Sequence, residues 1–212
     1  MWLRLKFWIG ILMEKIVKPL KYKSLDGFSE KQLSEHHDVL YAGYVKKINE
    51  IRAAIPNAKL DSANGTYAEI RELKLEETFA WNAIKLHEGY FDNLGGKGDS
   101  AVGKIAEWIA KDFGSYDKWV AEFAALGLCA RGWVVLAMDL ETGNLHNIVC
   151  DVHNQGGVWG CVPLIILDVY EHAYFLDYAT ARKKYIESFI KNLDWSVADD
   201  VVKCYKLETF RK

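Results

Sequence analysis

Two side chains that can bind a metal ion, Asp168 and His172, lie four residues apart after an apolar run. If the chain leaves an extended strand for a helical turn here, both side chains point the same way and one cation can take both. His36 and His87 lie on the apolar faces of two expected helices, where an imidazole is unusual unless something occupies it. Three imidazoles with one carboxylate suit Mn, Fe or Zn, and suit Ca or Cu(I) poorly.

Each of these residues also has an ordinary structural explanation. A single histidine on an apolar face is more often a hydrogen-bonded core residue, and Asp168 with His172 could be a helix cap beside a surface group. Only the combination of side chains from four segments favours a metal site. His37 directly follows His36, so it points off the ligand face, and His146 near an expected turn should be solvated.

Two long helices are expected to position the first two histidines. Apolar residues recur every three or four positions over residues 29–55 and again over about 66–94. Pro56 ends the first helix and Gly95 ends the second. A short join makes the pair an antiparallel hairpin, which cannot bury its apolar stripe alone.

The second half of the chain predicts a small sheet. Two β-rich runs, 133–140 and 145–152, flank a turn with Gly143, and the apolar run 162–169 leads to the Asp168 segment. Shorter helices are expected at 101–113, 116–126 and 180–193. Helices followed by an antiparallel sheet predict an α+β fold. The expected parts are an uncertain N-terminal extension (1–20), a helical hairpin domain (21–97) and a C-terminal α/β domain with a three-stranded antiparallel sheet and flanking helices (98–212).

The composition is that of an ordinary globular chain. Its 212 residues, half of them apolar, suffice for one substantial core or two lobes. The net charge of −2 excludes a bulk nucleic-acid binder, which needs a basic field. The four cysteines form no CxxC pair, so we interpret them as thiols in a reducing compartment, and cytoplasmic residence is expected.

The first twelve residues are basic and apolar. They lack the small-residue cleavage site of a secretory signal and are too short to cross a bilayer, and no stable membrane insertion is expected. Three interpretations stay open: a gene start placed too early with Met13 as the true first residue, an interfacial helix, or a degenerate export signal. We favour the first.

The motifs around the candidate ligands resemble those of the iron/manganese superoxide dismutase family. Residues 168–174, DVYEHAY, resemble its DVWEHAY signature, with Tyr170 in place of tryptophan. Residues 36–45, HHDVLYAGYV, and 81–87, WNAIKLH, resemble its two ligand helices. The resemblance covers roughly residues 22–195 and extends to Gly132-Trp133, to residues 178–185 and to residues 192–195.

The resemblance implies an enzyme that converts two superoxide radicals into O2 and H2O2 by cycling one Mn or Fe ion per subunit between M(III) and M(II). It assigns the four candidate ligands to that ion, without deciding between the two metals, and Tyr44 to the solvent end of the site. It also implies that Glu171 crosses a two-fold interface to His172 of the partner subunit. A homodimer is therefore expected, and dimers could pair into a tetramer.

Several positions depart from the family's pattern. Its iron branch carries a glutamine four residues before the second histidine ligand, as partner of the solvent molecule on the metal, and here that residue is Ala83. His153 or Gln155 is expected to take the role, and we favour His153 because a branch with an HNxG pattern uses histidine. Leu40 and Phe175 replace a polar pair that is usually linked across the dimer, which predicts a drier access channel.

Three large aromatic residues, Trp81, Phe91 and Trp133, are expected to form the apolar wall of the site. Two other functions compete with the enzyme. A metal-holding protein of the same fold would bind Mn or Fe without consuming superoxide. A carboxylate-bridged di-iron bundle would need several Glu-x-x-His pairs, which the sequence lacks.

Overall fold

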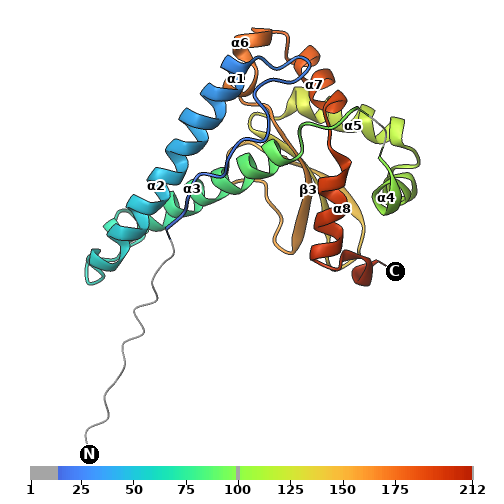
Figure 1. Cartoon of the computed structure of the whole chain (residues 1–212). Helices are drawn as coiled ribbons and strands as arrows, with labels where there is room; N and C mark the ends of the chain where they lie inside the picture. The colour runs from blue at the N-terminus through green and yellow to red at the C-terminus, as the bar shows by residue number, and fades with distance from the viewer. Residues whose placement is uncertain (1–13, 99–100, 212) are drawn as a thin grey trace, which may run out of the picture.

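The computed structural model describes residues 14–98 and 101–211, so the predictions for the first twelve residues and for Met13 lie outside the described part. It confirms the α+β fold: long N-terminal helices precede a three-stranded antiparallel sheet with flanking helices (Figure 1). Within these residues, no helix is both long and apolar enough to cross a membrane.

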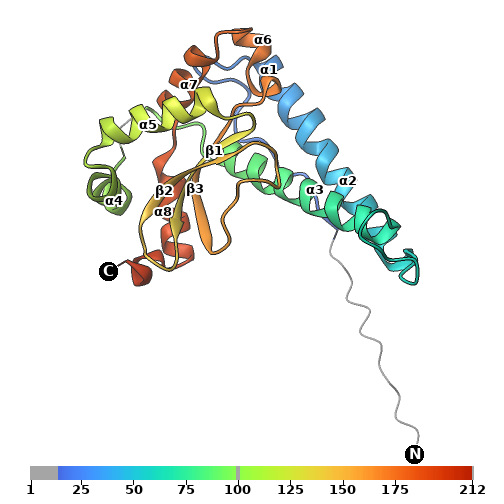
Figure 2. The ribbon, with the colours of Figure 1, turned by 180° about the vertical axis from the view of Figure 1, so that it is seen from behind.

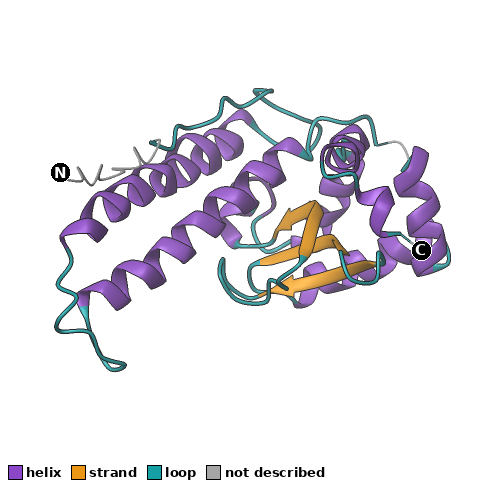
Figure 3. Ribbon diagram, turned by 90° about the horizontal axis from the view of Figure 1, so that it is seen from below, coloured by secondary structure: helices purple, strands orange, loops and turns teal. Residues whose placement is uncertain are grey.

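The N-terminal helices form the expected antiparallel hairpin (Figures 1 and 3). Its first arm consists of α1 (Glu30–Ser34), a π-helical segment (Glu35–Tyr41) and α2 (Ala42–Ala54), and its second arm is α3 (Glu69–Asp92). Ser29 begins the first arm, because its Oγ accepts a hydrogen bond from the backbone N–H of Gln32. Pro56 ends it in a short 3-10 turn, Ile55–Asn57.

The π-helical segment is a departure from the regular helix that the sequence predicted. Residues five apart lie about 140° apart around a regular α-helix, whereas the i→i+5 bonding of a π-helix brings them to one face. His36 and Tyr41 can therefore both face the core, where each is 1% exposed. The expected apolar stripe was wrong at Leu40, whose exposed fraction is 36%.

In the C-terminal part, short helices flank the sheet (Figure 2). The strands β1 (Trp133–Asp139), β2 (Leu145–Cys150) and β3 (Cys161–Asp168) lie in the order β2-β1-β3, and Trp133 pairs with Cys150 on one side and Asp168 on the other. The helices are α4 (Gly103–Phe113), α5 (Tyr116–Cys129), α6 (Phe175–Tyr178), α7 (Arg182–Lys191) and α8 (Trp195–Cys204), with 3-10 turns at Glu171–Ala173 and Leu207–Phe210.

The two parts share one core because α3 packs directly against β3. Gly89 allows this close approach: a Cβ at this position would lie 2.4 Å from Cδ1 of Ile166. His87, half a turn before Gly89, is thereby brought beside the end of β3, where Asp168 lies. The packing of the hairpin on the sheet thus brings together His87 and Asp168, which lie 81 positions apart in the chain, next to His36 on the first arm.

Candidate metal centre

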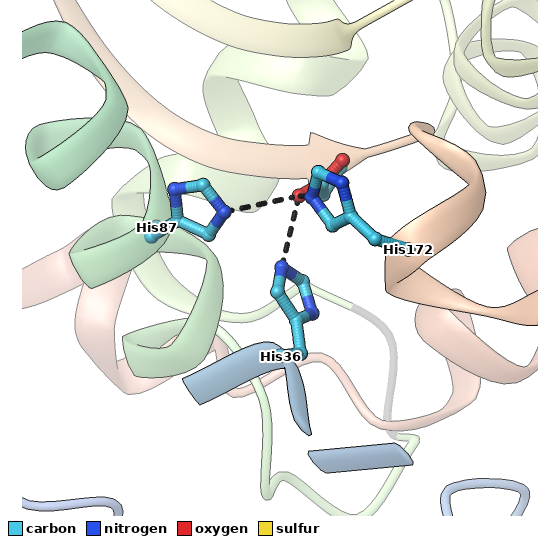
Figure 4. Close-up of side chains that lie close together, drawn as sticks. His36, His87 and His172 are labelled. Carbon is cyan, nitrogen blue, oxygen red and sulfur yellow. Dashed lines mark hydrogen bonds and ion pairs between the residues drawn. The ribbon is translucent and has the colours of Figure 1, made fainter. Parts of the chain in front are cut away.

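Four side chains from four separate elements converge at one point inside the molecule (Figure 4). His36 comes from the π-helical segment, His87 from α3, Asp168 from the end of β3 and His172 from the 3-10 turn that follows. Their Nε2 atoms lie 3.1, 3.6 and 3.2 Å, for His36, His87 and His172, from Oδ2 of Asp168. The four ligand atoms all lie within 4.8 Å of one another.

These residues fit a transition-metal ion. Ligand atoms about 2.1 Å from one ion lie about 3.0 to 3.5 Å from each other, close to the distances of the three imidazole nitrogens from Asp168 Oδ2. Nε2 of His87 and Nδ1 of His36 are both buried, and neither has a hydrogen-bond partner among the described residues. An unpartnered buried nitrogen is costly in a folded protein, and metal coordination of His87 Nε2 removes that cost.

The tautomer of His87 is set by its own helix. Its Nδ1–H donates to the backbone carbonyl of Ala83, one turn earlier, over 2.7 Å. The ring proton is therefore on Nδ1, and the lone pair of Nε2 points toward Asp168. Burial, with the neighbouring His36, lowers the pKa of His87 to about 3, so the ring stays neutral and able to bind a metal.

Asp168 is held as a carboxylate at the centre of the cluster. Burial alone would raise its pKa, but the charges and hydrogen bonds of His172 and His36 outweigh burial and hold the pKa of Asp168 well below its ordinary value. Its Oδ1 accepts from the backbone N–H of Tyr170 at 2.9 Å, and the Tyr185 hydroxyl donates to its backbone carbonyl at 2.5 Å. The carboxylate is thus fixed in orientation as well as in charge.

Gln32, which the sequence analysis did not single out, fixes the turn that carries His172. The side chain is 1% exposed, its Nε2 donates to the His172 carbonyl at 2.6 Å, and its Oε1 accepts from the N–H of Leu176 at 3.1 Å. A glutamine three residues after a capping serine is the only signal in the sequence, and it gives no indication of this long-range contact.

Next to the cluster, a hydrogen-bonded chain runs from Trp133 through His153 to Tyr44. The indole Nε1–H of Trp133 donates to Nδ1 of His153 at 3.1 Å, and Nε2 of His153 lies 2.9 Å from the Tyr44 hydroxyl. Burial lowers the pKa of His153 to about 4 and raises that of Tyr44, so both groups are neutral near pH 7. An indole can only donate, which places the single ring proton of a neutral His153 on Nε2, facing the Tyr44 oxygen.

The two other predicted site residues lie at the surface. Gln155 is exposed in the turn after β2, and among the described residues its side chain has no hydrogen bond. Glu171 is exposed beside His172, again without a side-chain partner in the described part of the chain. The structure thus brings His153 and Tyr44 to the metal cluster and leaves Gln155 and Glu171 pointing into solvent.

The predicted aromatic wall is correct for two of its three members. Trp133 is fully buried and its ring lies 5.0 Å from that of His87, and Phe91 packs 4.9 Å from His36. Trp81 was wrongly included: it is 44% exposed on the outer side of α3, and the Arg52 guanidinium lies 4.5 Å from its ring centre. Six residues separate Trp81 from His87, which places the two on different sides of the helix.

Comparison with known proteins gives the same family as the motifs. A family profile described as "Iron/manganese superoxide dismutases, C-terminal domain" matches residues 101–201. An iron superoxide dismutase of Aquifex aeolicus is 40% identical over 85% of this chain and 87% of its own length. One from Cupriavidus metallidurans is 38% identical, covering 86% and 93%. A manganese superoxide dismutase of Haloferax volcanii is 35% identical, covering 84% and 88%. The chain therefore belongs to the iron/manganese superoxide dismutase family.

Proposed function

We propose that this chain is a superoxide dismutase that uses one Mn or Fe ion per subunit. The observation that carries the proposal is the convergence of three imidazoles and one carboxylate, with the lone pair of His87 directed at the common point. When bound, the ion supplies the redox chemistry, in which one superoxide gives up an electron and leaves as O2 and a second gains an electron and two protons to form H2O2.

The chain's own contribution to proton delivery is the Trp133–His153–Tyr44 hydrogen-bonded chain. Because the ring proton of His153 is directed at the Tyr44 oxygen, the hydroxyl hydrogen of Tyr44 is left to donate to a water molecule in the site. A glutamine amide has two N–H donors, whereas neutral histidine has one, so His153 cannot serve Tyr44 and a water at the metal together. We therefore propose the histidine branch of the family, with Tyr44 as the terminal donor.

A homodimer is part of the proposal. Glu171 presents an exposed carboxylate beside His172, whose side chain is 27% exposed and whose Nδ1 has no hydrogen bond within the described residues. Leu40, Phe175 and Leu176 expose apolar side chains, the last two on α6, which packs against α1. A two-fold axis here would bring each Glu171 to His172 of the partner subunit and cover these apolar side chains. Sedimentation of the protein tests for the dimer, and it would also reveal tetramers.

We propose cytoplasmic residence. All four cysteines, of which Cys129 and Cys204 are exposed, are free thiols. Exposed free thiols favour a reducing compartment, because an oxidising one promotes unwanted disulfides. Localisation of a full-length fluorescent fusion tests this, and its export from the cytoplasm would contradict it.

The decisive experiment is superoxide consumption by the protein reconstituted separately with Mn and with Fe, normalised to bound metal. Turnover with either metal supports the enzyme and identifies its cofactor, and turnover with both makes it metal-tolerant. Stoichiometric binding of both metals without turnover would instead favour the metal-holding protein, and would mean that Ala83, Leu40 and Phe175 have removed the activity.

A further inference from the structure

A cavity of about 420 Å³ lies between α3 and one face of the sheet and reaches His153, outside the four candidate ligands. Alternate residues of β1 and β2 form its floor, and the register shift between β1 and β3 places Pro163 and Ile166 opposite Ala137 and Val135, on the same sheet face. The helix contributes Leu86 as well as the polar residues Asn82 and Lys85. The floor consists of Val135 and Ala137 from β1, Ile148 and Cys150 from β2, and Cys161, Pro163 and Ile166 from β3.

The charge of this lining is simple. Lys85 is the one lysine, arginine, aspartate or glutamate among the described residues that line the cavity. Within the described part of the chain, no carboxylate lies within salt-bridge distance of the Lys85 ammonium group, whereas Lys18 and Lys21 each have such a partner. The cavity therefore combines a mainly apolar lining with one cation that lacks a carboxylate partner and with the amides of Asn82 and Asn154.

The mouth of the cavity exposes an unusually large apolar surface. Trp159 is 99% exposed and the adjacent Val158 is 55% exposed, both between Gly157 and Gly160. A tryptophan side chain presents about 150 to 250 Å² of surface that is favourably removed from water. A molecule held in the cavity would contact this indole, whereas the protein alone leaves it in solvent.

From these observations we propose that the cavity binds a small monocarboxylate with an apolar body. The apolar part lies on the sheet floor formed around Val135 and Ile148, and the carboxylate accepts hydrogen bonds from Lys85 and Asn82. Trp159 packs on the ligand from the mouth. The volume, the mainly apolar lining and the few polar groups at one end are typical of sites for small ligands.

Calorimetric titration of the metal-loaded protein tests the proposal with three probes: decanoate, the neutral decanol and the ring acid 1-naphthoate. We expect saturable binding of decanoate or 1-naphthoate, and the stronger of the two identifies a chain-like or an aromatic ligand. Lys85→Gln should weaken binding of the acids about tenfold and that of decanol less than about twofold, since one charge-assisted contact is lost. Lys23→Gln, at an exposed lysine outside the cavity, should leave all three unchanged.

A second variant tests the position of the ligand. Ile148→Trp fills the cavity from the half-buried edge strand β2 and should abolish binding of all probes, while metal content and thermal unfolding show that the variant is folded. The proposal is overturned if neither acid binds, or if binding survives Ile148→Trp. It is also overturned if no probe binds and sedimentation shows an assembly that Trp159→Ala dissociates, because a second copy of the chain would then cover this surface.

Discussion

The buried ligands His87 and Asp168 differ from the outer ligand His172 in the source of their support. His87 and Asp168 are completely buried, and the chain itself fixes both: the Ala83 carbonyl sets the tautomer of His87, and the Tyr170 N–H orients the carboxylate of Asp168. His172 is partly exposed: Gln32 fixes its backbone and its Nε2 meets Asp168, but its Nδ1 has no hydrogen-bond partner among the described residues. One chain can therefore complete the inner half of the site, while the outer half leaves a ring edge available to a second subunit.

Removing an inner ligand should have the largest effect. His87→Ala is expected to weaken metal binding more than about a hundredfold and to abolish superoxide consumption, because it deletes a ligand whose orientation is built into α3. Metal content after dialysis and turnover provide the measurement. His146→Ala, at an exposed histidine on β2, is the control and should behave like the wild type. Full metal content in His87→Ala would exclude His87 as a ligand.

The hydrogen-bonded chain beside the metal should matter for turnover and not for metal binding. His153→Ala is expected to lower turnover per bound metal about a hundredfold, since a positioned proton donor contributes at least that much. Gln155→Ala is the matched comparison, because Gln155 is exposed two residues away, and it should retain wild-type turnover. The reverse result, a loss only in Gln155→Ala, would move the role to Gln155.

Loss of the support that His172 is proposed to receive from a second subunit should have a smaller effect on metal binding. Glu171→Ala should weaken both dimerisation and metal retention, the latter about tenfold, as expected for loss of a carboxylate that orients a ligand. Sedimentation and metal competition measure the two effects, and Glu141→Ala, at an exposed glutamate in the β1–β2 turn, serves as control. A dimer that keeps its metal and its activity without Glu171 would remove the proposed bridge.

The metal-free protein should lose stability on mild acidification. The ordinary pKa of histidine is 6.5, and burial lowers that of His153 to about 4 in the folded state. Between these pH values the unfolded chain binds a proton that the folded chain does not, so the free energy of unfolding decreases as the pH falls. Denaturant titration of wild type and His153→Gln at pH 7 and pH 4.5 tests this. The variant should lose less stability than the wild type, and equal losses would contradict the prediction.

The smallest effect should come from the start of the hydrogen-bonded chain. Trp133→Phe keeps an aromatic ring in the core but removes the N–H that donates to His153. Beyond the cost of the smaller ring, we expect a loss of about 1 kcal/mol in the free energy of unfolding. The ring proton of His153 is then free to occupy either nitrogen. Nitrogen NMR of the metal-free protein should show one tautomer in the wild type and a mixture in the variant, and a single tautomer in both would exclude the role of Trp133.

Much of the fold could be predicted, because hydrophobic spacing and chain-breaking residues are local signals. Both helices of the hairpin and the two strands around Gly143 lie within a few residues of their expected positions. Helix α8 was missed, although Asp194 caps it and Trp195, Ala198 and Val202 form its buried face. Its polar residues interrupt an apolar pattern only ten residues long, so the periodic signal is weak.

The parts of the site that could not be predicted depend on long-range geometry. The π-helical segment changes which residues of the first arm face the core, and so exposes Leu40, but no residue type marks it. The contact of Gln32 with the His172 carbonyl spans 140 positions in the chain. Residue types identified the ligands, whereas the supports of those ligands required the packing of hairpin on sheet.

The bond from His87 to the Ala83 carbonyl makes the metal part of the energetics of α3. An ion that binds only the Nδ1–H tautomer favours the helical arrangement in which Ala83 and His87 are one turn apart, and linkage requires that a stable helix in turn retain the ion. Local opening of α3 should then be rarer in the loaded protein. Amide hydrogen exchange around residues 83–87 would slow on metal loading, so that the helix reports the occupancy of the site.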